Sequence, residues 1–170
     1  MTSSLGVGGT ERRLFSLVSN LQSHKNVLVS IISFDDTGYY KNIISELDIN
    51  LIIIKGSYIK RMVMLYKTFN RIKPDIVHIF TFSTIYALII AKLTGIRKLI
   101  SSFGGNYFPG NRSFDTFLLR FIYKIFDPFI NLYICNSHIG KKCLLAELNL
   151  NHKKIIVINN GLDFNLMSEK

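Results

Sequence analysis

The stretch LGVGGTERR at residues 5–13 is rich in glycine and leads directly into an amphipathic helix. After it, apolar residues recur at Leu14, Leu17, Val18 and Leu21, the spacing of one helical face. The helix is therefore predicted to begin near Gly9 or Thr10. Its first backbone N–H groups have no partner within the helix and carry partial positive charge, and glycines let a ligand approach closely. Two interpretations are open: a phosphate or sugar-diphosphate site, or a tight turn that binds nothing.

Downstream of this stretch, predicted strands and helices alternate along the chain. Short β-branched apolar runs predict buried strands, and apolar residues at helical spacing predict helices between them. The predicted strands are Asn26–Phe34, Leu51–Ile54, Asp75–Phe80, Lys98–Ser102, Leu132–Cys135 and Ile155–Ile158; the predicted helices are Tyr39–Leu47, Ile59–Ile72, Thr84–Leu93, Phe114–Phe126 and Ser137–Leu148. The alternation predicts one doubly wound α/β domain with a mainly parallel sheet and helices on both faces. On the Ile59–Ile72 helix, Met62, Tyr66 and Phe69 are expected to face the core.

The glycine stretch should follow the first strand of such a domain, yet only Met1–Ser4 precede it. Four mostly polar residues are too few for a buried central strand, so the chain is expected to lack that strand. The Asn26–Phe34 and Asp75–Phe80 strands would then face each other across a gap, each with an unpaired edge. We therefore expect a chain that is marginally stable or prone to aggregation.

Ligands of doubly wound sheets bind at the carboxyl ends of the strands. Four stretches of this chain are predicted to gather there, because each follows a strand or begins the helix after one. They are the Gly8-Gly9 loop, the turn after His78, the loop after Ser102 and Asn136-Ser137.

The composition bounds the class of protein. With 170 residues, of which 48% are hydrophobic, the chain is long and apolar enough to fold around a core. Its net charge of +10 indicates anionic partners such as nucleotides, acidic lipid surfaces or nucleic acid. The basic residues are scattered, and no stacking-aromatic motif of a nucleic-acid module is present, so nucleic acid is not favoured.

Other compositional signals concern the compartment. Cys135 and Cys143 lie in different predicted elements and match no metal-ligand spacing, which favours reduced thiols and a cytosolic protein. The first residues lack the basic and apolar regions of a signal peptide. The most apolar segment, residues 76–91, contains polar residues and is shorter than the ~20 residues that a membrane span needs. It is interpreted as a strand followed by a helix.

A nicotinamide-dependent dehydrogenase is one alternative, because Asp35-Asp36 after a predicted strand mimics the acid that binds a ribose. Residues 6–11 do not match the pattern G-x-G-x-x-G, however, because Glu11 stands where the third glycine belongs. A second alternative is a truncated, non-catalytic remnant of a larger enzyme.

Five segments, in order, resemble a known family. GGTER at 8–12 resembles the GGxER loop of family 4 glycosyltransferases, and KPDIVH at 73–78 resembles their PDVVH strand. AKLTGI at 91–96 resembles the helix end AxxxGIP, with Arg97 in place of the proline, and Asn136-Ser137 resembles a segment that offers a serine after a strand. KIIVINNGLD at 154–163 resembles the signature KIxVIPNGID.

The resemblance implies one lobe of a GT-B fold. Such enzymes have two Rossmann-like lobes: the amino-terminal lobe binds the acceptor, and the carboxyl-terminal lobe binds the nucleotide-sugar donor through a basic residue and an E-x7-E pair. Transfer retains the anomeric configuration and usually needs no metal; no other cofactor is implied. Residues 1–170 would be the acceptor-side lobe without the donor lobe, truncated at both ends and inactive alone. The pathway implied is synthesis of cell-surface polysaccharide or lipopolysaccharide, from a nucleotide-sugar donor to a glycan or lipid-linked acceptor; the individual sugars stay open.

The resemblance also implies site residues. Gly8 and Gly9, with Thr10 and Glu11, would lie against the donor diphosphate across the cleft. His78 is either a hydrogen-bond donor in the cleft or a satisfied core histidine. Phe103 stands where the family commonly presents a histidine to the sugar, followed by Gly104, Gly105 and Asn106, of which Asn106 could substitute. Asn136 and Ser137 are further cleft candidates, Asn160 and Gly161 form the turn that ends the lobe, and no catalytic residue is assigned.

The predicted helix Phe114–Phe126 is amphipathic in an unusual way. One face carries Phe114, Phe117, Leu118, Phe121, Ile122 and Ile125, while Arg120 and Lys124 lie on another. It is either a core-packing helix with a solvated face or a surface helix that contacts anionic lipid. In the second case the protein would be peripheral on the inner face of the cell membrane, with five basic candidates: Lys60, Lys67, Arg71, Arg120 and Lys124.

Overall fold

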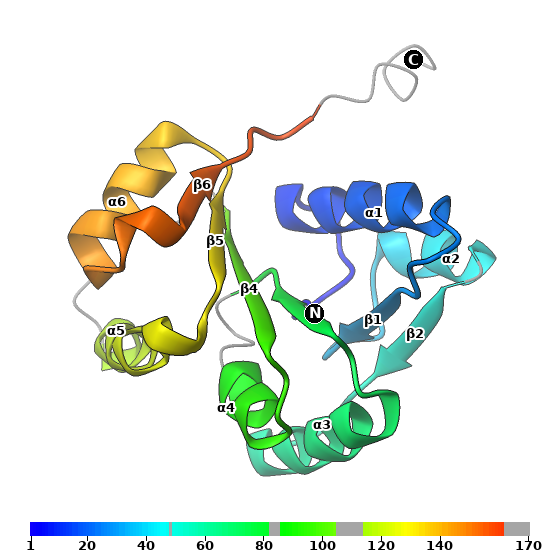
Figure 1. The fold of residues 1–170 in the computed structure, drawn as a ribbon. Helices are drawn as coiled ribbons and strands as arrows, with labels where there is room; N and C mark the ends of the chain where they lie inside the picture. The colour runs from blue at the N-terminus through cyan, green and yellow to red at the C-terminus, as the bar shows by residue number, and fades with distance from the viewer. Residues whose placement is uncertain (48, 82–85, 105–113, 162–170) are drawn as a thin grey trace.

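A computed structural model describes residues 1–47, 49–81, 86–104 and 114–161. Parallel strands alternate with helices that lie on both faces of the sheet (Figure 1), which confirms the predicted α/β architecture. The helices are α1 (Gly9–Gln22), α2 (Tyr39–Glu46), α3 (Tyr58–Ile72), α4 (Tyr86–Leu93), α5 (Phe114–Phe126) and α6 (His138–Leu148). The strands are β1 (Ser30–Ser33), β2 (Asn50–Ile53), β3 (Ile76–Ile79), β4 (Lys98–Phe103), β5 (Leu132–Cys135) and β6 (Ile155–Val157).

The strands form a two-stranded sheet, β1-β2, and a four-stranded sheet, β3-β4-β5-β6, and every pair is parallel. Met1 and Thr2 lie between the two sheets. The amino nitrogen of Met1 donates to the His78 carbonyl at 2.6 Å, and the Phe80 N–H donates to the Met1 carbonyl at 3.0 Å. On the other side, the Thr2 N–H donates to the Ile32 carbonyl at 3.0 Å.

The expected gap in the sheet is therefore wrong, because Met1 and Thr2 occupy the slot next to β1 and β3. Their polarity is accommodated: the Thr2 hydroxyl donates to the Ser4 carbonyl at 3.1 Å, while Met1 and Leu5 bury apolar side chains. Two residues pair too briefly to count as a strand, so Thr2 makes only an isolated parallel bridge to Ser33.

The boundaries of α5 and β5 agree with the prediction, and most other ends differ by one or two residues. The exception is the predicted strand Asn26–Phe34, of which only Ser30–Ser33 forms β1, while Leu28 is fully exposed. The pairing explains the difference, because β2 matches β1 over four residues only, from Asn50 to Ile53.

On two helices, some of the residues expected in the core are exposed. On α3, Met62 packs against the core and Phe69 is buried as predicted, but Tyr66 is half exposed and Leu65 is buried beside it. On α5 the side chain of Tyr123 is buried, and its hydroxyl lies 3.1 Å from the Ser101 hydroxyl of β4.

This anchor turns the α5 residues Phe117, Phe121 and Ile125 toward solvent. The interpretation of these three as core residues is wrong. Ile122 packs against the core as that interpretation required, and Phe126 packs there as well.

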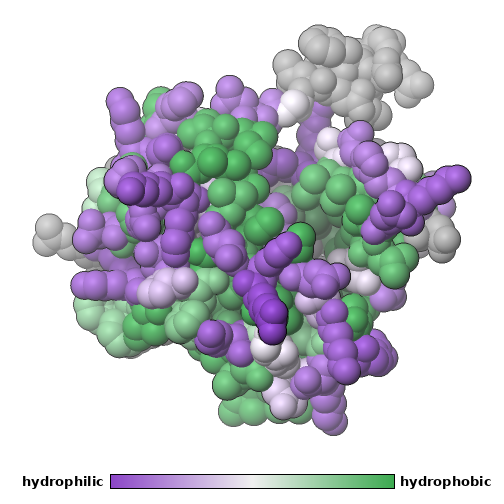
Figure 2. All heavy atoms as spheres, viewed as in Figure 1, coloured by the Kyte–Doolittle hydropathy of each residue, from purple (hydrophilic) through white to green (hydrophobic). Residues whose placement is uncertain are grey.

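The face of the four-stranded sheet that points away from α5 is only partly covered among the described residues. Ile134 and Ile156 are register partners on that face, and Ile156 and Ile158 are exposed. Figure 2 shows apolar residues collected beside β6, framed by hydrophilic ones. In the described residues no helix is long and apolar enough to cross a membrane.

Candidate functional site

The amino-terminal end of α1 faces open space. Gly8 is extended and caps the helix, and the Arg12 N–H donates to the Gly8 carbonyl at 2.9 Å. A Cβ added at Gly9 would meet no atom of the described residues within 4 Å, whereas one at Gly8 would lie 2.4 Å from a carboxylate oxygen of Glu11. The Gly9 backbone is therefore accessible to a ligand, and Gly8 makes room for Glu11.

Glu11 is held within the same loop. The Ser4 hydroxyl donates to its Oε1 at 3.0 Å, and an acidic side chain in the first turn stabilises a helix. Glu11 thus supports the local fold of the loop.

The loop after β4 lies against this end of α1. A Cβ at Gly104 would be 3.2 Å from the Thr10 hydroxyl, and the Arg13 Nη1 donates to the Phe103 carbonyl at 3.5 Å. The structure thus brings Thr10, Phe103 and Gly104 together as predicted. Gly105 and Asn106 lie outside the described residues.

Arg13 is the functional candidate that sequence reasoning missed. Its Nε and Nη2 are buried without a hydrogen-bond partner, and its guanidinium lies 5.7 Å from the ring centroid of Phe80. Burial lowers the pKa of Arg13, and no carboxylate pairs with it in the described part of the chain. The available signal was a cation one turn after Gly9, at the edge of the apolar face of α1.

A buried guanidinium without an anion is costly, and this one lies beside a helix amino terminus that also favours negative charge. Arg13 and the amino terminus of α1 thus place positive charge beside the loop that follows β4, which makes this end of α1 a candidate for binding an anion. A diphosphate has the charge and the oxygen acceptors for it.

His78 is part of β3 and contacts β4. Its Nε2 lies 2.7 Å from the Ser102 hydroxyl, and its ring packs 4.1 Å from the ring of Phe80. Burial, with the nearby charges of the Met1 amino group and Arg13, lowers the pKa of His78 to about 3. The imidazole is therefore neutral at physiological pH, and these contacts favour the satisfied histidine over a free donor in the cleft.

This pKa predicts acid sensitivity. Between pH 6.5 and pH 3 the unfolded histidine binds a proton that the folded one does not, so stability should fall as the pH is lowered through this range. His78→Gln should flatten that part of the curve of urea midpoint against pH. His24→Gln, at an exposed histidine, is the control and should leave the curve unchanged; equal flattening by both variants would contradict the assignment.

Asn136 and Ser137 follow β5 on the same side of the sheet. The Ser137 hydroxyl accepts a hydrogen bond from the Gly140 N–H at 3.0 Å and so caps α6. Asn136 is half buried beside it, and Asn160 and Gly161 are exposed beyond β6. Of these residues, Ser137 is occupied by a structural role.

The acids that suggested a dehydrogenase are engaged locally. Asp35 accepts hydrogen bonds from the Thr37 backbone and hydroxyl at 3.1 and 2.9 Å, and these bonds lower its pKa. Asp36 forms an ion pair with Lys55 at 2.5 Å. Neither carboxylate stands free to bind a ribose.

Metal-ligand and thiol chemistry find little support in the residues described. They contain no group of three or more His, Cys, Asp or Glu that could hold a metal ion. Cys135 and Cys143 are free thiols, and burial raises the pKa of Cys135 to about 11, which keeps it protonated.

Solved structures show the same fold. HepE from Anabaena, crystallised with UDP-glucose, matches 96% of this chain with a TM-score of 0.78 at 17% identity, over 43% of its own length. A glycosyltransferase from Rickettsia africae matches 97% of the chain with a TM-score of 0.75 at 18% identity, over 42% of its length. WaaB, a lipopolysaccharide outer core galactosyltransferase in its apo form, matches 96% with a TM-score of 0.66 at 15% identity, over 46% of its length.

The chain thus spans less than half the length of each of these structures. No curated protein matches it significantly. The family model described as "Glycosyltransferase Family 4" matches residues 7–166. This range is nearly the whole chain and includes all five of the segments that carry the resemblance. The chain belongs to Glycosyltransferase Family 4.

Proposed function

We propose that this chain is the acceptor-side lobe of a retaining glycosyltransferase that moves a sugar from a nucleotide-sugar donor to a glycan or lipid-linked acceptor. The observation that carries the proposal is the buried Arg13 guanidinium, whose Nε and Nη2 have no hydrogen-bond partner, beside the accessible backbone of Gly9 and the loop at Gly104. Membership of the family supports it. The donor class is supported by HepE, whose structures contain UDP or UDP-glucose.

The chemistry of the site suits the departure of a nucleoside diphosphate. Negative charge grows on the leaving diphosphate as the bond to the sugar breaks. Preorganised donors aimed at that charge lower the barrier more than donors that must reorient. The α1 amino terminus and the Arg13 guanidinium are fixed by the fold, and Gly9 leaves room for phosphate oxygens against the backbone.

Gly9→Ala tests the site with little effect on the fold. The new Cβ meets no protein atom, so the urea midpoint should hold or rise slightly, because alanine is the better helix former. It would stand in the space assigned to the phosphates. Binding is followed by NMR amide shifts during titration with UDP-glucose, and the shift changes should be largest at residues 8–13. Gly9→Ala should weaken the affinity for UDP-glucose at least about tenfold, or ~1.4 kcal/mol.

Gly6→Ala is the matched control, because its Cβ also has room within the same loop and lies before the helix begins. It should leave the titration unchanged. Equal weakening by both variants, or shifts confined to residues away from α1, would contradict the assignment of the site.

We further propose that these 170 residues alone do not complete a transfer, because they span 43% of HepE and the family resemblance assigns donor binding to the other lobe. Incubation with labelled nucleotide sugars and lipid-linked acceptors should give no product above the blank. Turnover by the chain alone would contradict the division of labour between lobes, while leaving the anion site to the titration above.

A further inference from the structure

A row of apolar side chains on α5 faces solvent. Phe117, Phe121 and Ile125 are 69%, 54% and 47% exposed, and Phe129, four residues further in the 3₁₀ turn Asp127–Phe129, is 40% exposed. We call these four residues the α5 stripe. Four large apolar residues in a continuous row are more than the scattered exposure usual for a protein surface.

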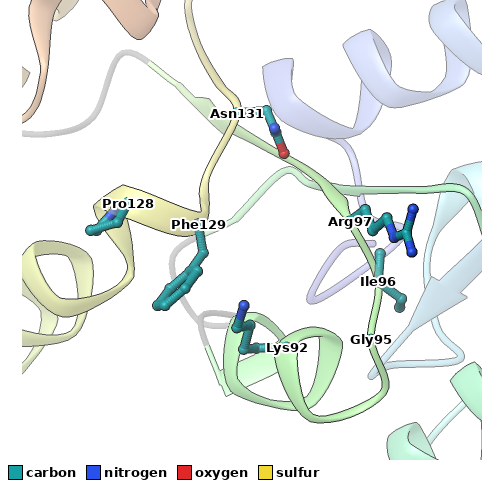
Figure 3. A pocket seen from close by; sticks show the side chains of 7 residues that line it. All are labelled: Lys92, Gly95, Ile96, Arg97, Pro128, Phe129 and Asn131. Atoms are coloured by element: carbon teal, nitrogen blue, oxygen red, sulfur yellow. The ribbon is translucent and has the colours of Figure 1, made fainter.

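The Phe129 end of the stripe borders a cavity of about 410 Å³. Figure 3 shows its walls, which come from the end of α4, the start of β4 and the turn after α5. The lining includes Lys92, Ile96, Arg97, Pro128, Phe129 and Asn131. None of the described residues that line it carries a carboxylate.

Two cations line this cavity without an anionic partner among the described residues. The Lys92 ammonium lies 3.9 Å from the ring centroid of Phe129, so charge and stripe are in direct contact. Arg97 lines the cavity as well, and neither Lys92 nor Arg97 forms an ion pair with the described residues.

The polar side chain of Asn131 in the cavity wall and the two nearby acidic side chains already have hydrogen-bond or ion-pair partners. Asn131 is tied to β4, because its Oδ1 accepts from the Leu99 N–H at 2.8 Å and its N–H donates to the Leu99 carbonyl at 2.9 Å. Asp127 accepts a hydrogen bond from the Tyr133 hydroxyl at 2.9 Å, and Glu147 is paired with Arg120. The cavity therefore keeps its positive charge.

We propose that the α5 stripe and this cavity form a docking surface for an anionic lipid bilayer. The rings of the stripe enter the boundary between head groups and acyl chains, as the apolar face of an interfacial helix does. Lys92 holds the phosphate of a lipid head group at the cavity, Arg97 adds positive charge at its edge, and Lys124 lies beside the stripe on the same helix. This surface does not depend on the sugar transfer proposed above.

The geometry narrows the basic residues considered from sequence. Arg120 is paired with Glu147 and is not available to lipid, whereas Lys124 is exposed. Lys60, Lys67 and Arg71 are exposed on α3, which α4 separates from α5 (Figure 1). The α3 surface exposes Ile59 and Val63 as well, so it serves as a matched control of similar composition.

The test is flotation of the full chain with phosphatidylcholine vesicles, with and without phosphatidylglycerol. The wild type should float only with the anionic vesicles. Phe117→Ser with Phe121→Ser should weaken partitioning at least about tenfold, and Lys92→Glu with Arg97→Glu about fivefold or more per charge. Ile59→Ser with Val63→Ser should change nothing. Circular dichroism confirms that each variant, altered only at exposed positions, is folded.

Other outcomes would overturn the proposal. Equal flotation with neutral and anionic vesicles would remove the role of the cations, and a loss as large in the α3 control would move the surface elsewhere. A dimer in sedimentation velocity without vesicles that becomes monomeric with Phe117→Ser and Phe121→Ser would make a second copy of the chain the occupant. Complete release by inorganic phosphate, but not by sulfate or chloride of equal ionic strength, would make the cavity a site for free phosphate.

Discussion

Gly38→Ala should destabilise the protein by about 3 kcal/mol or more, the upper range for a single substitution. Gly38 has φ +129°, a conformation that side chains rarely adopt, and its added Cβ would lie 2.3 Å from the carbonyl carbon and oxygen of Leu5. Those atoms are backbone and cannot rotate away. The neighbouring Tyr40 N–H donates to the same Leu5 carbonyl at 3.0 Å, so the turn into α2 holds the start of the glycine loop in place.

Gly95→Ala separates the two causes. Gly95 also has positive φ, at +75°, but its Cβ would meet no atom within 4 Å, so only the conformational cost of about 1 kcal/mol should appear. Urea midpoints of both variants measure the difference. Equal losses would show that the contact with Leu5 relaxes without cost. If Gly38→Ala also shifts the NMR signals of residues 5–9, the turn does position the anion site.

Arg13→Met should stabilise the protein, in contrast to Gly38→Ala. The free energy of unfolding should rise by about 1 kcal/mol or more, while the stabilisation by a bound anion should disappear. Replacing a buried charge that lacks an ionic partner by an apolar side chain of similar volume removes its desolvation cost. Arg13 keeps only a long hydrogen bond to the Phe103 carbonyl and the ring of Phe80. The same change would remove the cation that we assign to the diphosphate.

Thermal unfolding with and without inorganic pyrophosphate measures both effects. Pyrophosphate at about ten times its dissociation constant should stabilise the wild type by about 1.4 kcal/mol and should not stabilise Arg13→Met. Arg12→Met removes the neighbouring arginine on the same turn and is the control that should keep most of the pyrophosphate effect. A destabilised Arg13→Met, or equal losses in both variants, would contradict an anion site at Arg13.

The elements of this fold follow from local signals. The α1 helix starts where a glycine loop meets a helical apolar spacing, and α3 ends at Ile72, two residues before Pro74. Where an element ends through pairing, local signals fail. The apolar run at residues 26–34 begins before the first register pair, Ser30 with Asn50 on β2, so Leu28 has no strand beside it and is exposed.

Orientation was harder to predict than position. The α5 sequence has apolar residues on more than one face, and periodicity alone does not say which face is buried. The hydrogen bond between Tyr123 and Ser101 decides it, and that pairing depends on where β4 lies. Arg13 was missed for a related reason, since its burial arises where the end of β4 meets α1, far away in sequence.

Met1 and Thr2 form a narrow connection between the two sheets, and we call this connection the seam. Among the described residues, the backbone hydrogen bonds that join the β1 and β3 sides of the sheet run through this pair of residues, whereas the strands within each sheet are joined by longer ladders. Amide protons at the seam should exchange with solvent before those inside either sheet. The glycine loop is bonded to α2 on one side of the seam, and Gly104 follows β4 on the other. Local opening at the seam would therefore separate the two sides of the proposed anion site. The affinity of that site for an anion should then depend on how often the sheet opens there.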